Sequence, residues 1–432
     1  MHDTGHRRGS AARARGPAWQ MWVAGAALAV LSAAANMASP LYPAYQQSLG
    51  MSDLTMTALY ATFAAAAVPS LLLFGAAADA VGRKPVLIAG LACAFAGTAL
   101  FAASGGIAGL FLGRLLLGVA LGMGTGAGIA VMVESAPAQR PTRGSTLTTL
   151  AFVGGSGGGP LMAGLLAQRL PAPATTPFVA MLGLVAAVGL LVLTLHGPTL
   201  PAGRRWRPTR PAVPPTVRRT FAIAGVTGFL GWAVVGIFLA LLPTVAEAVT
   251  AAPSPAASGA VVGALLLCSA LSQPAASRLE PRAAQSIGLT ALAIGMTLLV
   301  GSYLPLFSGG WALGVMAVAA VVCGCGHGIS YWGAAREVDV LVGRRHRAGV
   351  TAALYLSFYA GAGIPAVGVG LLSLAMPLMT AIQAVSMVIV LCTVAFLPVP
   401  GLVQTPVLNR SEGRGRKGAV APAEVDAVST GA

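Results

Sequence analysis

The chain has 432 residues, of which 56% are hydrophobic and only 9% are charged. Soluble domains carry about 25% charged residues, so the polar surface that a soluble protein of this length needs is missing. Uncharged stretches of about 20 residues recur, and each is long enough to cross about 30 Å of hydrocarbon as a helix. The composition excludes a soluble enzyme, a nucleic-acid-binding domain and a disordered chain. It predicts an all-α polytopic membrane protein.

Twelve apolar spans follow one another along the chain. Their expected bounds are 19–40, 54–76, 85–103, 107–131, 145–168, 176–196, 220–242, 257–276, 283–303, 311–333, 349–370 and 376–397. The basic start of the chain resembles a signal peptide, but the first apolar run is longer than a signal core and more spans follow. We therefore expect the first span to remain as a transmembrane helix.

The net charge of +15 is explained by where the basic residues lie. If the N-terminus is cytoplasmic and the spans alternate, 24 of the 26 Lys and Arg residues fall in cytoplasmic segments, and only Arg114 and Arg169 do not. An excess of Lys and Arg in cytoplasmic loops is the rule that sets orientation. The charge therefore predicts a plasma-membrane protein with both termini in the cytoplasm. Its expected partner is membrane lipid rather than nucleic acid.

A long break rich in Pro and Arg, residues 197–219, divides the spans into two sets of six. We expect five regions: a cytoplasmic N-terminal tail (1–18), an N-terminal six-helix bundle (19–196), a cytoplasmic linker (197–219), a C-terminal six-helix bundle (220–397) and a cytoplasmic C-terminal tail (398–432). The halves look related, because RGSTLTTLAFVGGSGGGP ends at Pro160 and AGVTAALYLSFYAGAGIP ends at Pro365. A parallel duplication is a known transporter plan, with the substrate site between the halves.

The loop after the second span reads GAAADAVGRK and contains Gly75, Asp79, Gly82, Arg83 and Lys84. It resembles the signature loop of the major facilitator superfamily, G-x-x-x-D-x-x-G-R-K/R, although Ala replaces the usual Arg after the Asp. The two glycines are expected to permit a tight turn. Asp79 is expected to accept hydrogen bonds from a helix N-terminus, and the two basic residues to hold the loop in the cytoplasm. The alternative is an ordinary basic turn.

The resemblance covers about residues 19–397 and implies the major facilitator fold. In that fold, twelve helices form two pseudo-symmetric six-helix bundles that rock about a central cavity to give alternating access. We expect the chain to work as a monomer, without a cofactor or a metal. In the state open to the outside, Asp79 is expected to meet the start of the eleventh span, near Ala348 and Gly349.

Span four carries Arg114 followed by Gly118, which resembles the R-x-x-x-G motif of the same superfamily. A charge inside a span costs at least about 2.5 kcal/mol on insertion scales, so it usually faces a cavity. The alternative is that the Arg114 side chain reaches to the nearby outer surface.

Span five carries Gly155, Gly159, Pro160 and Gly164 in the stretch GSGGGPLMAG. The stretch resembles the antiporter motif g-x-x-x-G-P-x-x-G-G, which marks exporters in this family. Small residues allow two helices to approach closely, and Pro bends a helix by removing one backbone hydrogen bond. Generic small-residue packing is the alternative interpretation.

The same stretch also satisfies G-x-S-x-G around Ser156, so an intramembrane serine hydrolase is a rival from another class. A nucleophile elbow needs a strand-to-helix turn, whereas Ser156 lies in the middle of a span. His327 would have to be its base. We therefore expect no enzyme and no catalytic residue.

Polar residues form stripes on three spans: Ser32, Asn36 and Ser39 on the first, His327 and Tyr331 on the tenth, and Tyr355 and Tyr359 on the eleventh. Polar stripes usually face the bundle interior. These residues are therefore candidates for lining a cavity or for coupling, although contact with a neighbouring helix is the alternative for each. Cys323 and Cys325 lie near His327, but the helical spacing turns them to different faces and predicts no metal site.

No acidic residue sits at the middle of a span, where a proton-coupled transporter usually places a titrating carboxylate. Glu134 and Glu337 lie at span ends, where pairing with Arg143 or Arg345 is expected. His327 is therefore the first candidate for proton coupling and Glu134 the second.

The sequence predicts a secondary active transporter that exports small amphipathic or apolar compounds in exchange for protons. The alternative is an uptake facilitator or symporter of the same superfamily.

Overall fold

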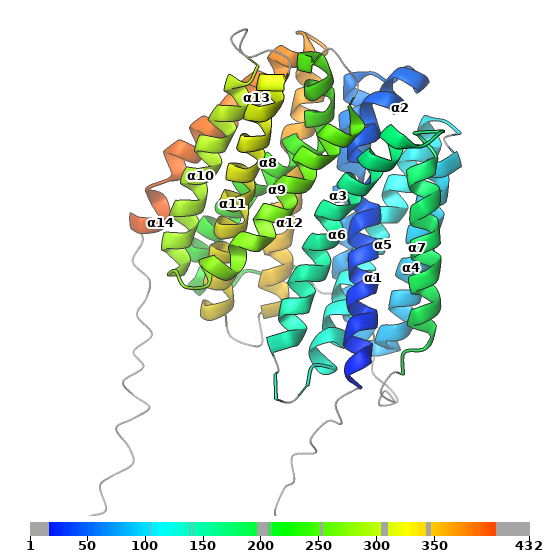
Figure 1. The fold of residues 1–432 in the computed structure, drawn as a ribbon. Helices are drawn as coiled ribbons and strands as arrows, with labels where there is room; N and C mark the ends of the chain where they lie inside the picture. Colours follow the sequence, from blue (N-terminus) through cyan, green and yellow to red (C-terminus); the bar gives the residue numbers. More distant parts are fainter. Residues whose placement is uncertain are drawn as a thin grey trace, which may run out of the picture.

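The computed structural model describes residues 17–103, 105–137, 139–140, 142–196, 206, 208, 210–250, 254–303, 310–342 and 347–402. In these residues the secondary structure is entirely helical (Figure 1). The helices are α1 (Ala18–Asn36), η1 (Ser39–Leu41), α2 (Tyr42–Leu49), α3 (Asp53–Val81), α4 (Arg83–Ala103), α5 (Ile107–Glu134), α6 (Thr142–Arg169), α7 (Thr176–Leu193), η2 (Pro215–Val217), α8 (Arg218–Thr250), α9 (Pro255–Ala276), α10 (Pro281–Gly301), α11 (Gly310–Leu341), α12 (Arg347–Leu372), α13 (Leu378–Phe396) and α14 (Val399–Leu402).

The expected fold class is confirmed. Twelve stretches of the described chain are long and apolar enough to cross a membrane, one for each predicted span. Several helices run beyond the apolar core: α3 continues to Val81, α8 to Thr250 and α11 to Leu341. The first span continues through η1 into α2. Pro40 lies at the start of η1 and Pro43 at the start of α2. Because Pro lacks an N–H group, it begins a new helical segment more easily than it continues one.

Local sequence explains several helix ends. Ser52 precedes α3, and its hydroxyl accepts a hydrogen bond from the Thr55 backbone N–H at 3.2 Å. Ser254 does the same for α9, where the Ala257 N–H donates at 3.4 Å. Serine caps of this kind satisfy a donor that the first helical turn leaves free. Between α3 and α4 the break is a single residue, Gly82, whose φ of 105° suits glycine.

The helices form two groups that lie side by side, α1–α7 and α8–α14 (Figure 1). The packing partners repeat between the groups. In the first group α5 packs on α3 and α4, and α1 packs on α6; in the second, α11 packs on α9 and α10, and α8 packs on α12. This repetition fits the internal duplication that the sequence indicates.

The two groups meet mainly through two helix pairs, α3 with α12 and α6 with α9. Both pairs touch near the same end of the bundle. On α12, Gly370 packs on Leu54 and Thr57 at the start of α3, and Gly164 near the end of α6 packs on Pro255 at the start of α9. We call this end the closed end. The other end, where α3 meets α4 and α11 finishes, is called the basic end.

The structure corrects one expectation about the loop after the second span. Gly75 does not form a turn, because α3 continues as a helix through Val81. Instead, Gly75 lies beside Gly126 of α5, where a Cβ at Gly126 would meet the Gly75 Cα at 3.1 Å. Gly82 alone makes the turn. The side chain of Asp79 lies outside the described residues, as does that of Ala348.

Candidate functional site

A cavity of about 30 Å³ lies between the two groups of helices. Residues from five helices line it: Ala35, Asn36, Tyr60, Phe63, Ala64, Arg114, Trp232, Leu239, Tyr359 and Ala362. Roughly 10–15 Å³ is enough for one water molecule, so the cavity has room for about two. Any larger solute needs the two halves to move apart first.

Arg114 is almost completely enclosed, with 2% of its surface exposed. Its Nη1 donates to the backbone oxygen of Ala35 at 2.6 Å. The guanidinium carbon lies 5.2 Å from the ring centre of Tyr42, 5.9 Å from that of Tyr60 and 5.6 Å from that of Phe63. Of the two alternatives left by the sequence, the structure therefore places Arg114 in the interior, beside the cavity.

Gly118 lies one turn further along α5 and faces α3. A Cβ there would collide with the Phe63 backbone oxygen and crowd Ala66. The absence of a side chain at Gly118 therefore allows α5 and α3 to pack closely. This packing holds Arg114 and Phe63 at the same level of the bundle.

His327 of α11 lies at the centre of a polar and aromatic cluster. Its Nδ1 is 2.7 Å from the Ser269 hydroxyl, and its ring stacks on Tyr331. The Trp232 ring stands perpendicular to it, with ring centres 5.1 Å apart. The Nε2 atom has no hydrogen-bond partner among the described residues. Trp232 also stacks on Tyr359 at 6.1 Å, and both residues line the cavity. The cluster therefore adjoins the cavity through Trp232.

The predicted stripe residues are brought together only in part. Asn36 and Tyr359 line the cavity, whereas His327 and Tyr331 lie behind Trp232. The hydroxyls of Tyr331 and Tyr355 are 3.3 Å apart, so these two tyrosines bridge α11 and α12.

Tyr60, Phe63 and Trp232 line the cavity but were missed by the sequence reasoning. Aromatic residues within apolar spans look like ordinary core. One signal was present: an indole N–H inside a membrane needs an acceptor, which makes Trp232 a candidate on chemical grounds alone.

The glycine–proline stretch of α6 contacts two different helices. Gly155 and Gly159 pack directly on the backbone of Ala29 and Ala33 in α1. Pro160 and Gly164 face α9, where they meet Gly259 and Pro255. The stretch therefore joins α1 of its own half to α9 of the other half, at the closed end.

Ser156 does not have the surroundings of a nucleophile. Its hydroxyl donates to the Phe152 backbone oxygen at 2.7 Å, one turn earlier in the same helix. The histidine that would serve as its base is hydrogen-bonded to Ser269 instead.

At the basic end, the expected partner of Glu134 is wrong. Glu134 pairs with Arg83 rather than Arg143, with Arg83 Nε 2.8 Å from Oε2. Glu337 pairs with Arg282, whose Nε lies 2.7 Å from Oε1, and its expected partner Arg345 lies outside the described residues. In each half, the bridge joins the start of one helix to the end of its neighbour.

Glu134 therefore lies far along α5 from the cavity, bound to the first residue of α4. Lys84 donates to the backbone oxygen of Leu193 at 2.5 Å and fixes the start of α4 against the end of α7. Gly349, expected to meet Asp79, contacts the linker: its backbone oxygen accepts from the Ala212 N–H at 3.2 Å.

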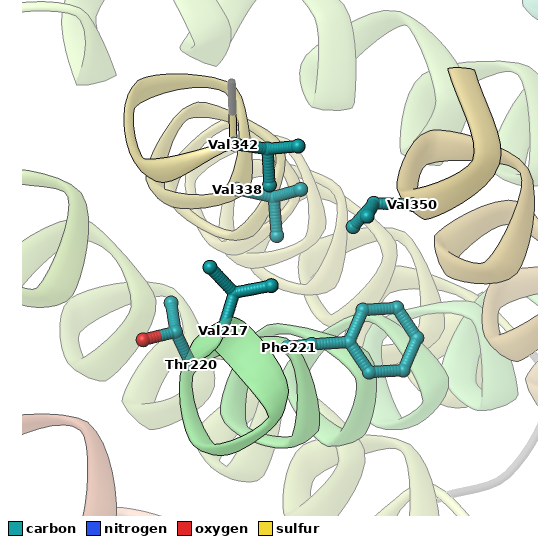
Figure 2. A pocket seen from close by; sticks show the side chains of 6 residues that line it. All are labelled: Val217, Thr220, Phe221, Val338, Val342 and Val350. Atoms are coloured by element: carbon teal, nitrogen blue, oxygen red, sulfur yellow. The ribbon is translucent and has the colours of Figure 1, made fainter. Parts of the chain in front are cut away.

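A second hollow lies at the basic end, between α8, α11 and α12. Figure 2 shows Val338 and Val342 facing Val217 and Phe221 across it, with Val350 at one side. The hollow is too narrow to admit water and has one hydroxyl in its lining, that of Thr220. It offers no chemistry for a site.

Comparisons with known proteins agree with this arrangement. A family model described as Major Facilitator Superfamily matches residues 24–367. No curated protein matches the sequence.

Two solved structures with a similar fold are transporters. The nucleoside transporter NupG has a TM-score of 0.68 at 16% identity, covering 89% of this chain and 98% of that one. A POT family transporter in complex with 5-aminolevulinic acid has a TM-score of 0.70 at 11% identity, covering 89% and 96%. At identities this low, the TM-scores show a shared fold alone.

Proposed function

The chain belongs to the major facilitator superfamily and is a multi-pass membrane protein that transports small molecules, and we propose that it exports amphipathic or apolar compounds in exchange for protons. The transport cycle is alternating access: the halves rock, and the cavity between them opens to one side and then to the other. The cavity beside Arg114 is the proposed solute site.

The direction of transport rests on one observation, the glycine–proline stretch of α6. Its sequence resembles the antiporter motif, and its residues lie where a gate has to lie, between α1 and α9 at the closed end. A helix seam without side chains lets the two halves seal tightly against each other. A tight seal on the outer side supports export because it prevents solute from leaking back.

The orientation follows from the charge. We propose that the basic end faces the cytoplasm, that the chain lies in the plasma membrane with both termini in the cytoplasm, and that the structure is a state closed to the outside. The distribution of 24 of the 26 Lys and Arg residues supports this orientation. Because the cavity lies between the two halves of the same chain, we propose the monomer as the working unit.

His327 is the proposed proton site. Histidine is the side chain whose charge changes between about pH 5 and 8, and His327 adjoins the cavity through Trp232. Protonation would add a second positive charge near Arg114 and change the balance between the two access states. Glu134 is the less favoured alternative, since Arg83 already neutralises it and it lies at the basic end.

The test measures accumulation of fluorescent dyes and antibiotics in cells with and without the protein. Export predicts lower accumulation with the protein, and faster loading of inside-out vesicles when a pH gradient is applied. The control is Gly159→Val, which overpacks the α1–α6 seam. Higher accumulation in expressing cells would overturn export and establish uptake by the same fold.

A further inference from the structure

The charge at the cavity is not balanced. No carboxylate in the described part of the chain lies within ion-pair distance of Arg114. The acidic residues that form ion pairs in the described part of the chain bind other basic residues, namely Arg83, Arg282 and Arg336. No acidic residue lines the cavity among the described residues. An enclosed guanidinium without a counter-charge is costly unless other groups compensate it.

The contacts that Arg114 does make compensate only part of this cost. One hydrogen bond to Ala35 and three aromatic faces surround the guanidinium. Its Nε has no acceptor among the described residues. A guanidinium carries five N–H donors in a planar fork, so several donors remain for a ligand.

A second unsatisfied donor borders the same cavity. The indole Nε1 of Trp232 is enclosed and has no acceptor among the described residues. Tyr60 and Tyr359 line the cavity as well, and the hydroxyl of each tyrosine is a further possible donor. The cavity wall is therefore rich in donors, carries one positive charge and is otherwise aromatic or aliphatic.

We propose that the transported solute is an organic anion: a carboxylate or similar oxyanion carried on a flat apolar body. The oxyanion binds the Arg114 fork and the Trp232 N–H, and the apolar body lies against the rings of Tyr60, Phe63 and Tyr359. An oxyanion presents the paired acceptors that match an Arg fork. The inference rests on the proposed function, and it narrows amphipathic solutes to negatively charged ones.

The experiment uses three probes with one ring system: 2-naphthoate, 2-naphthamide and 2-naphthylmethylamine. Each is titrated against the purified full-length protein, and the shift in thermal midpoint reports binding, since a ligand of the folded state stabilises it. We expect naphthoate to bind about tenfold or more tightly than the amide, as hydrogen bonds to a charged group imply. The amine should bind more weakly still.

Variants identify the residue responsible. Arg114→Gln should weaken naphthoate binding about tenfold or more and so remove most of the preference for naphthoate over naphthamide. Arg169→Gln is the matched control, because it removes the same charge from an exposed position and should change nothing. Trp232→Phe keeps a ring, removes the second donor and should weaken naphthoate binding a few-fold. If Arg114 variants fold poorly, Trp232→Phe still tests whether the donors of the cavity bind the carboxylate.

Equal or tighter binding of the amide or the amine by the wild-type protein would overturn the inference, and so would failure of naphthoate to bind. Dye transport in vesicles separates the two proposals. If dyes cross and no preference for anions is found, the inference falls and the proposed function stands. If no solute crosses while naphthoate binding depends on Arg114, the proposed function falls and the anion site stands.

Discussion

Arg83, the first residue of α4, forms a salt bridge with Glu134, the last residue of α5, and Nε lies 2.8 Å from Oε2. Arg282 and Glu337 repeat the bridge in the second half. The two bridges differ in their surroundings: the Glu134 side chain is 42% exposed, whereas that of Glu337 is 3% exposed. Gln285 also donates to Glu337 at 2.5 Å and accepts from the Thr227 hydroxyl at 2.9 Å. The second bridge is therefore part of a buried network.

Removing each glutamate should have unequal effects on stability. Glu337→Ala leaves Arg282 and Gln285 without their acceptor in a buried site, which costs about 3–5 kcal/mol. Glu134→Ala removes a more exposed partner and costs about 0–1 kcal/mol. Thermal unfolding of the purified variants measures the difference. Equal losses would mean that burial does not distinguish the two bridges.

Adjacent glycines in α6 should respond differently to one methyl group. A Cβ at Gly159 would collide with the backbone of Ala33, whereas a Cβ at Gly158 has nothing within 4 Å. Overpacking costs about 1–3 kcal/mol, so Gly159→Ala should lower both the thermal midpoint and transport, and Gly159→Val should abolish transport. Gly158→Ala should be neutral, or stabilising by up to about 1 kcal/mol through helix propensity.

Ser156→Ala completes the α6 series and tests the hydrolase alternative. The variant loses one hydrogen bond within its own helix and should transport almost normally. Loss of all activity in this variant, together with labelling of the wild-type protein by a serine-reactive probe, would favour the hydrolase.

The sequence was sufficient to predict the helices, because a helix that crosses a membrane requires a long apolar run. Such a run can be read from neighbouring residues alone. The sequence was insufficient for the two salt bridges. Glu134 and Arg143 are close in sequence, but the partner that the fold supplies, Arg83, arrives from a different helix. The cavity shows the same limit. Arg114 was identified because a charge inside a span is conspicuous, whereas Tyr60 and Phe63 resemble core residues until the helices are placed around them.

His327→Gln should separate exchange from coupling. If His327 carries the proton, the variant loses transport driven by a pH gradient but still exchanges labelled for unlabelled solute across vesicles. Ser269→Ala is the control, since it removes the 2.7 Å hydrogen bond and keeps the ring. Full gradient-driven transport by His327→Gln would exclude His327 and direct attention to Glu134.

The proposed orientation predicts which end of the bundle is reached from outside. Gln47, at the end of α2, and Ser277, after α9, are both exposed, at the closed and basic ends respectively. In a background without the five native cysteines, Gln47→Cys should react with an impermeant thiol reagent in intact cells. Ser277→Cys should react only after the cells are opened. The reverse pattern would invert the topology.

The most direct test of alternating access locks the closed end. Gln168 of α6 and Ser254 before α9 lie across the gate, with Oε1 and Oγ 3.4 Å apart. Cysteines at both positions, in the same cysteine-free background, are joined by a short bis-methanethiosulfonate reagent that dithiothreitol removes. A matched pair within one half, Gln46→Cys and Asp53→Cys, replaces two residues whose side chains are hydrogen-bonded at 2.6 Å.

The account predicts that cross-linking 168 to 254 stops solute transport in vesicles, that dithiothreitol restores it, and that cross-linking 46 to 53 leaves it intact. Undiminished transport by protein fully cross-linked between 168 and 254 would contradict the claim that this seam has to open.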